Sequence, residues 1–374
     1  MSNNNIKYIF NISFSLLFFL FFFIFVDILF SNFIYKKELK IRYDCFSYKN
    51  YSFNDNEYND YELLKNCVAT EKQRTVVPYT VYTDINGYRY SGKERFLDRK
   101  NLVFLGDSFT YGYGVKFEHS FPGIIQSKVK NYEVYNLAVP GYGIQKYAYR
   151  LKEFFKNKKA SKIFLTLDMT DINDAAFRWI KIPNSESPVL KSKHINKDIT
   201  NWKNFKNSNF KGTKLLVFYL RNSIRYIKLK LKPSNMGDKD TALRSDIANF
   251  TYTKLKDNSR LDKNNLNKSI SIINEHFKEI SNLANKNNAE LYLIICPWPE
   301  TLIYGQEVFN WENFSNKLCE DHNCKKVINL FSDFNEVKQK NKNWKHLIYI
   351  DDDIHLKKFG ANLVANKVIE EIVN

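Results

Sequence analysis

Two residues far apart in the sequence, a serine and a histidine, have the side chains best suited to nucleophilic chemistry. Ser108 lies in GDSFTYG, directly after the apolar run NLVFL at residues 101–105. A serine hydroxyl is a poor nucleophile at neutral pH unless a base, commonly an imidazole, removes its proton. The run DDDIH ends at His355, and its D-x-x-H spacing lets the carboxylate of Asp352 reach the imidazole and stabilise the imidazolium. We therefore predict Ser108 as nucleophile, His355 as base and Asp352 as the group that orients the base.

Short apolar runs, typical of buried strands, recur through the second part of the chain. They lie at residues 101–105, 133–139, 162–168, 290–296 and 326–330. Helical periodicity lies between several of them, for example over 145–156 and 270–287. Strands alternating with helices predict an α/β fold with a parallel sheet. Ligands bind beyond the carboxyl ends of such strands, which is where the sequence places Ser108.

Four motifs, in the same order, resemble the SGNH (GDSL-like) hydrolase family. They are GDSFTYG, AVPGYG, a block ending in Asp171, and D-x-x-H near the C-terminus. The resemblance covers roughly residues 75–374, and NGYR at 86–89 and PWP at 297–299 are similar to features of membrane-anchored bacterial envelope members. It implies a flavodoxin-like three-layer α/β/α sandwich with a parallel sheet, and ester chemistry without metal or other cofactor.

The resemblance also implies an oxyanion hole. The backbone N–H groups of Ser108 and Gly141 match the first two donors. The third block departs from the family pattern G-x-N-D, because Thr170 occupies the asparagine position. A threonine hydroxyl is shorter and has one donor, and the loss of an oxyanion donor typically costs about 10²- to 10³-fold in rate. Asn173 is the alternative third donor if the loop bends.

The acidic residues around these motifs also suggest a divalent metal site. They are Asp168, Asp171, Asp174, Asp351, Asp352 and Asp353, with His355 beside them. Catalytic metal sites need ligands from several elements at matched spacing, so we predict no metal. Trp298 in PWP is either a wall of the substrate site or a core aromatic residue, and the general burial of such side chains favours the core.

The N-terminal segment predicts a membrane anchor. Residues Tyr8 to Val26 are almost wholly apolar, and 19 residues at about 1.5 Å each span roughly the 30 Å hydrocarbon core. Asp27 closes this stretch at the interface, where a carboxylate is tolerated. A cleaved signal peptide would need small residues next, yet no alanine precedes Ala69. We expect an uncleaved transmembrane helix in the cytoplasmic membrane.

Two features disagree about orientation. A basic cluster follows the span at Lys36, Lys37, Lys40 and Arg42, whereas only Lys7 precedes it, which favours a cytoplasmic domain. Two local cysteine pairs and one cysteine in an apolar run are typical of an oxidising compartment; the pairs are Cys45 with Cys67 and Cys319 with Cys324, and the lone thiol is Cys296. Because large domains translocate despite flanking charge, we predict a single-pass protein with a periplasmic catalytic domain.

The chain divides into an anchor at 1–35, a β-rich lead-in at 36–100 and an SGNH-like domain at 101–374. A basic segment at 180–262 interrupts that domain. It contains LLVFYLRNSIRYIKLKLK at 215–232, which suits an amphipathic helix on a membrane or an anionic polymer. A helical arm packed on the core is the other interpretation, and we prefer it because amphipathicity mostly signals burial.

The 57 Lys and Arg residues exceed the 40 Asp and Glu residues, which gives a net charge of +17. Lysine predominates in a chain also rich in Asn, Ile, Phe and Tyr, so we attribute the charge to codon composition and expect no nucleic-acid partner. The resemblance implies an acylated carbohydrate or other small ester as substrate, with an O-acetyl ester of envelope polysaccharide as the expected one, hydrolysed through an acyl-enzyme on Ser108. A polysaccharide O-acetyltransferase and a catalytically degenerate glycan-binding or scaffold protein are the alternatives.

Overall fold

The computed structural model describes residues 13–29, 44–54, 56–71, 77–96, 98–183, 185–191, 220, 224, 263–306, 309–351 and 353–373. The chain forms two compact units. One comprises residues 1–42 and 193–236, and the other comprises residues 43–192 and 237–374. Each unit is described by itself.

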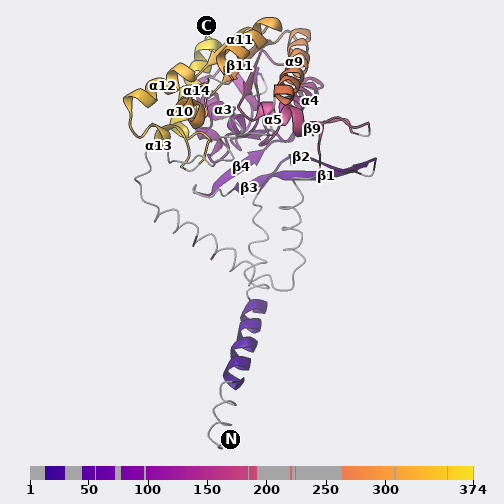
Figure 1. Cartoon of the computed structure of the whole chain (residues 1–374), viewed down its shortest axis with the longest axis vertical. Helices are drawn as coiled ribbons and strands as arrows, with labels where there is room; N and C mark the ends of the chain where they lie inside the picture. Colours follow the sequence, from indigo (N-terminus) through magenta and orange to yellow (C-terminus); the bar gives the residue numbers. More distant parts are fainter. Residues whose placement is uncertain are drawn as a thin grey trace, which may run out of the picture. The chain divides into compact units, whose positions relative to one another are not determined.

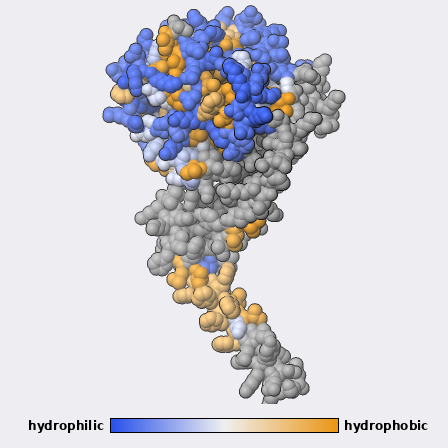
Figure 2. Space-filling model, turned by 90° about the vertical axis from the view of Figure 1, so that its left-hand side faces the viewer, coloured by the Kyte–Doolittle hydropathy of each residue, from blue (hydrophilic) through white to orange (hydrophobic). Residues whose placement is uncertain are grey.

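In the first unit, residues 13–29 form a helix. Its aromatic and aliphatic side chains are exposed, as the hydrophobic colouring of its surface shows (Figure 2). Within the described residues, no helix is both long enough and apolar enough to cross a membrane. The transmembrane helix expected over Tyr8 to Val26 begins outside the described residues and stays a prediction. The amphipathic stretch at 215–232 also lies outside them, apart from Leu220 and Ile224.

The second unit is built on an eight-stranded sheet with the order β12-β11-β8-β6-β7-β5-β4-β3. Its parallel part comprises β6 (Lys100–Leu105), β7 (Tyr132–Asn136), β8 (Lys162–Leu167), β11 (Glu290–Ile295) and β12 (Lys326–Asn329). These are the five strands that the apolar runs predict. Their order along the sheet is the flavodoxin-like one, with its switch point between β6 and β8. The mostly parallel α/β fold is therefore confirmed.

Helices cover both faces of this sheet. Figure 1 shows α4 (Ile144–Phe155), α5 (Asp171–Phe177) and α9 (Lys263–Lys286) on one side, and α3 (Phe121–Lys128), α10 (Pro299–Tyr304), α12 (Phe331–Lys340) and α14 (Lys358–Val373) on the other. The contacts agree, because α9 packs on α4 and α5, whereas α14 packs on α3. The remaining helices are α2 (Ser108–Tyr111), the 3-10 turn η1 (Phe117–His119), α11 (Trp311–Asp321) and α13 (Trp344–Ile348).

The core between the layers is aromatic as well as aliphatic. Phe104 on β6 stacks on Phe164 on β8 at 5.1 Å between ring centroids, and Phe164 stacks on Tyr292 on β11 at 5.0 Å. These rings are buried, and burial of an aromatic side chain is among the largest single contributions to a core. The stack holds together three of the strands, β6, β8 and β11, whose carboxyl ends lie at the edge of the sheet that carries the site.

The lead-in contributes to two sheets. Antiparallel strands β3 (Val68–Glu71), β4 (Tyr79–Thr83) and β5 (Arg89–Tyr90) extend the main sheet beyond β7. A separate antiparallel sheet has the order β1-β2-β10-β9, from β1 (Phe46–Phe53), β2 (Asn56–Leu63), β9 (Trp179–Ile180) and β10 (Val189–Lys191). The lead-in thus pairs with the start of the segment at 180–262. The domain boundaries expected from the sequence stay predictions.

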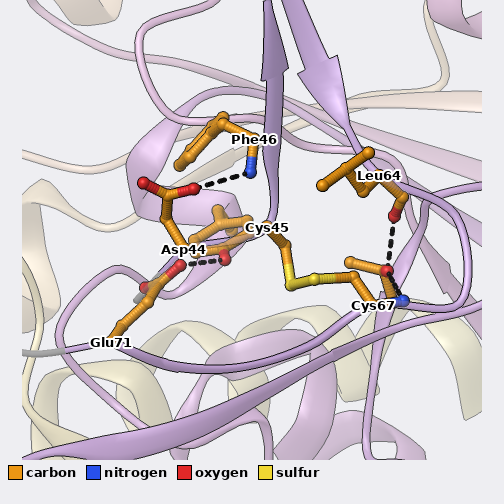
Figure 3. Close-up of a disulfide and its surroundings, with 8 residues drawn as sticks. Asp44, Cys45, Phe46, Leu64, Cys67 and Glu71 are labelled. Carbon is orange, nitrogen blue, oxygen red and sulfur yellow. Dashed lines mark hydrogen bonds between the residues drawn. A yellow bond between two sulfur atoms is a disulfide. The ribbon is translucent and has the colours of Figure 1, made fainter. Parts of the chain in front are cut away.

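Both cysteine pairings expected from the sequence are present. Cys45 is bonded to Cys67, which ties the start of β1 to the strand β3 of the main sheet (Figure 3). Cys319 is bonded to Cys324 at the end of α11, and Cys296 is a buried free thiol.

Arg89, the arginine of NGYR, clamps the loop that follows the candidate nucleophile. Its fully buried guanidinium donates to the carbonyl oxygens of Tyr111 and Gly112 at 2.6 and 2.7 Å, and to that of Val115 at 2.6 Å. The guanidinium carbon also lies 4.3 Å from the centroid of the Tyr111 ring. One side chain therefore satisfies three carbonyl groups.

We predict that Arg89→Met lowers the free energy of unfolding by about 3 kcal/mol, because three carbonyl groups lose the guanidinium that donates to them and the side chain loses its contact with the Tyr111 ring. Urea denaturation measures the change. The exposed Lys93 supplies the control, since Lys93→Met should alter stability by less than about 0.5 kcal/mol. Equal stability of the two variants would show that the clamp is energetically unimportant.

Candidate active site

Ser108 begins a short helix directly beyond β6. Gly106 connects the strand to this turn at φ +152°, and a Cβ there would lie 2.3 Å from Thr110 Oγ1. Asp107 caps the helix, because its Oδ1 accepts a hydrogen bond from the Phe109 N–H at 2.9 Å. The Ser108 hydroxyl is half-buried and donates to Asp107 Oδ2 at 2.9 Å. In this structure the hydroxyl of Ser108, the candidate nucleophile, is therefore hydrogen-bonded to Asp107, the N-cap residue of the same helix.

His355 lies on the loop before α14 and is oriented by Asp353. Its Nδ1 is 2.5 Å from Asp353 Oδ1. The same oxygen accepts from the backbone N–H groups of Ile354 at 2.7 Å and His355 at 3.1 Å, which fixes the carboxylate. Burial alone would raise the pKa of Asp353, but the hydrogen bond and charge of His355 outweigh it, so this pKa lies below its ordinary value.

The other ring nitrogen of His355 is the one that a general base would use. Nε2 is buried and has no hydrogen-bond partner among the residues that the structure describes. The ring packs against Phe109 and Tyr113, with centroid separations of 5.3 and 5.0 Å. His355 and Ser108 line the same small cavity. The structure therefore brings the predicted base and nucleophile together, at the expected edge of the sheet.

Asp352, the orienting residue expected from the D-x-x-H spacing, lies outside the described residues. Asp353 makes the contact with His355 that the sequence analysis assigns to Asp352. The remaining acid of the run, Asp351, is exposed and pairs with His346 and Lys357 at 2.8 and 2.9 Å. The signal for Asp353 was present as D-x-H, two residues from the histidine.

Gly141 lies in a turn beyond β7. The Tyr142 N–H donates to the Val139 carbonyl at 3.1 Å, and Pro140 followed by glycine at φ +75° is the pattern of a type II turn. A Cβ on Gly141 would lie 2.7 Å from both Tyr61 Oη and Arg178 Nη2. A side chain at this position would displace both groups and strain the backbone at this φ. The role of Gly141 as an oxyanion donor with the Ser108 N–H stays a prediction.

The backbone N–H and the hydroxyl of Thr170 are both used in hydrogen bonds to a neighbouring carboxylate. Its N–H and its hydroxyl donate to Asp168 Oδ1 at 2.7 and 2.6 Å. Since a hydroxyl has one proton, this bond weighs against Thr170 as the third oxyanion donor. The side chain of Asn173, the alternative donor, lies outside the described part of the structure.

Several buried carboxyl groups surround this turn. Burial raises the pKa values of Asp168 and Asp171 well above the ordinary value, and the nearby Asp107 raises both further. Burial also raises the pKa of Asp174 to about 6, against the opposing charge of Arg178. Within the described residues, no group of three or more His, Cys, Asp or Glu side chains could hold a metal ion.

Sequence reasoning missed the parts of the site that come from distant segments. Tyr61 on β2 donates to the Pro140 carbonyl at 2.9 Å, and Arg178 pairs with Asp174 at 3.3 Å. No local motif marks either residue. Trp298, buried and stacked on Phe109 at 6.0 Å, supports the site from the core, as its expected burial predicted.

The comparisons with known proteins reach only distant structures. No protein-family model matches the chain, and no curated protein matches it. One similar structure is a member of the lipolytic G-D-S-L family from Veillonella parvula, 14% identical, with 74% of this chain and 99% of that chain covered and a TM-score of 0.38. Others are the esterase EstA from Pseudoalteromonas sp. (12%, 73% and 97%, TM-score 0.37) and the acetylxylan esterase Axe2 from Geobacillus stearothermophilus (10%, 73% and 94%, TM-score 0.37). Likeness at this level does not establish a family or a reaction.

We predict that Asp353→Asn lowers the rate at which Ser108 reacts with a fluorophosphonate by about 10²-fold or more, because the imidazole loses the carboxylate that holds its tautomer. Asp352→Asn is the matched comparison and should change the rate by less than about tenfold. Labelling rates followed by intact-protein mass measure both. A larger loss in Asp352→Asn would restore the assignment made from the D-x-x-H spacing.

Proposed function

We propose that this protein is a serine-dependent ester hydrolase in which Ser108 attacks an ester carbonyl and His355 takes the serine proton. The observation that carries the proposal is the shared cavity of Ser108 and His355, with Asp353 on one ring nitrogen and the other nitrogen buried and unpartnered among the described residues. An imidazole oriented in this way by a carboxylate is the arrangement that activates a serine.

Attack would require the Ser108 hydroxyl to turn from Asp107 to His355. Hydrogen bonds of this kind are often absent or long in free enzymes and form only when substrate is bound. Proton transfer to Nε2 would create an imidazolium opposite Asp353. The lowered pKa of Asp353 keeps it ionised there, so it would stabilise that charge. His355 would then return the proton to the departing alkoxide, which leaves an acyl group on Ser108.

The size of the site favours a short acyl group. The cavity shared by Ser108 and His355 has a volume of about 10 Å³, close to the smallest space that holds one water molecule. The rings of Phe109 and Tyr113 confine it beside His355. Because a cavity of this size has no room for a long acyl chain, we propose acetyl as the acyl group and an O-acetylated envelope polysaccharide as its source.

We predict that wild-type protein hydrolyses a chromogenic acetyl ester and that Ser108→Ala reduces the rate by at least about 10³-fold, because the nucleophile is gone. Ser127→Ala, which changes an exposed serine on α3, is the matched control and should keep the wild-type rate. Comparable hydrolysis by Ser108→Ala would exclude Ser108 as the nucleophile. Acetyl transfer to an added oligosaccharide faster than to water would make the protein an O-acetyltransferase.

The proposed location is outside the cytoplasm, with the N-terminal apolar segment as anchor. The two disulfides support it, because such bonds persist in oxidising compartments. The glycan-binding alternative rests on Thr170 at the asparagine position and on the basic segment at 180–262, most of which lies outside the described residues.

We predict that cells lysed directly into denaturant with an alkylating reagent yield protein labelled only at Cys296, because the other four cysteines are oxidised. Mass spectrometry counts the labels, and prior reduction provides the control with all cysteines labelled. Full labelling without reductant would contradict an extracytoplasmic location.

A further inference from the structure

The cavity beside His355 is lined in part by the segment that follows α2, residues 112–115, which we call the wall segment. Its lining residues are Gly112, Tyr113 and Val115. The Tyr113 ring lies 5.0 Å from the imidazole ring, centroid to centroid. Gly114 adopts φ +87°, a conformation that glycine tolerates and other residues rarely adopt. The position of the wall segment therefore sets the space beside the base.

The lead-in strands hold the wall segment without entering the cavity. Among the described residues, those that line the cavity come from 108–121 and 355–361, and none comes from β3, β4 or β5. Arg89 on β5 nevertheless donates to two carbonyl groups of the wall segment, at 2.7 and 2.6 Å. Tyr79 on β4 accepts a hydrogen bond from the Gly114 N–H at 2.9 Å. Side chains of the lead-in thus fix both carbonyl and N–H groups of this wall.

Tyr79 is held in turn by a buried carboxylate. Its hydroxyl donates to Glu71 Oε2 at 2.6 Å, and the hydroxyl of Tyr111 donates to Glu71 Oε1 at 2.8 Å. Glu71, on β3, is only 6% exposed, and each of its carboxylate oxygens accepts one tyrosine. Tyr111 ends α2, the helix that begins at Ser108. Glu71 therefore joins the wall segment, through Tyr79, to the helix of the candidate nucleophile.

Both tyrosine hydroxyls keep their protons and so remain donors. Burial raises the pKa of Tyr79, and the charge of Glu71 raises it further. Burial also raises the pKa of Tyr111 well above its ordinary value, against the opposing charge of Arg89. The Tyr79 hydroxyl consequently donates to Glu71 and accepts from Gly114 at the same time.

We propose that Tyr79, held by Glu71, is a positioning residue that limits the acyl group: it fixes the wall segment where the cavity admits acetyl and excludes longer acyl chains. The inference rests on the proposed function, because it names the source of the acyl-length selectivity of that site. An apolar pocket distinguishes substrates that differ by one methylene by about tenfold or more in kcat/KM. A wall segment free to move outward would lose that discrimination.

The test compares kcat/KM of the full-length protein for chromogenic acetyl and butyryl esters. Tyr79→Phe keeps the ring but removes the oxygen that bridges Glu71 and Gly114. We expect the butyryl-to-acetyl ratio of kcat/KM to rise at least about tenfold, with kcat/KM for the acetyl ester within about threefold of wild type. Glu71→Gln leaves one of the two tyrosines without an acceptor and should raise the ratio in the same direction.

Tyr82→Phe is the matched control. Tyr82 lies on the same strand as Tyr79, and the alternation of buried and half-buried residues along β4 places it on the opposite face. It should keep the wild-type ratio. If kcat/KM for both esters fell in parallel in Tyr79→Phe, at an unchanged ratio, Tyr79 would only stabilise the fold and the inference would be overturned. An equal rise of the ratio in Tyr82→Phe would overturn it as well.

Amide hydrogen exchange separates failure of the inference from failure of the proposed function. The peptide that contains Gly114 should exchange at least about tenfold faster in Tyr79→Phe than in wild type, because the wall segment opens more often. An unchanged exchange rate would overturn the inference whatever the esters show. Faster exchange, with neither ester hydrolysed by wild type, would reject the proposed function and its acyl-length selectivity and leave Tyr79 as an anchor of the wall segment alone.

Discussion

The position of Asp107 at the end of β6 is the constraint on which the rest of the site depends. One carboxylate oxygen accepts the Phe109 N–H and so starts helix α2, while the other accepts the hydroxyl of Ser108. The strand ends and the helix begins within three residues, which is possible because Gly106 adopts a backbone conformation that a side chain would obstruct. The same carboxylate, that of Asp107, therefore caps the helix and positions the nucleophile.

The topology of the sheet explains why acidic residues gather around this cap. At the switch point between β6 and β8, the chain leaves both strands at the same edge of the sheet. Asp168 follows β8 directly, and Asp107 follows β6 after Gly106. Asp107 and Asp168 are both buried here. Burial, together with the charge of Asp107, raises the pKa of Asp168 well above its ordinary value. His355 comes from a third segment, the loop before α14, and is oriented by its own partner, Asp353.

The sequence predicted the elements well because each is encoded locally. Five apolar runs became the five parallel strands, since a strand buried on both faces needs a continuous apolar sequence. Ser108, His355 and both disulfide pairs were likewise marked by short motifs or spacing. The sequence alone could not decide between Asp352 and Asp353 as the partner of His355. Both lie close enough along the chain for their carboxylates to reach the imidazole ring, so only the fold of the loop selects Asp353. Tyr61 and Arg178 could not be foreseen, because they reach Gly141 through the pairing of β2 with strands from another part of the chain.

The central claim is that Ser108 carries the acyl group during reaction. Rapid mixing of the full-length protein with an activated acetyl ester, followed by acid quenching and peptide mass spectrometry, tests it directly. The account predicts a mass increase of one acetyl group on the peptide that contains Ser108, formed and then lost as substrate is consumed. Turnover with the acetyl group on another residue, or with no acetylated intermediate although trapping is fast enough to detect one, would contradict it.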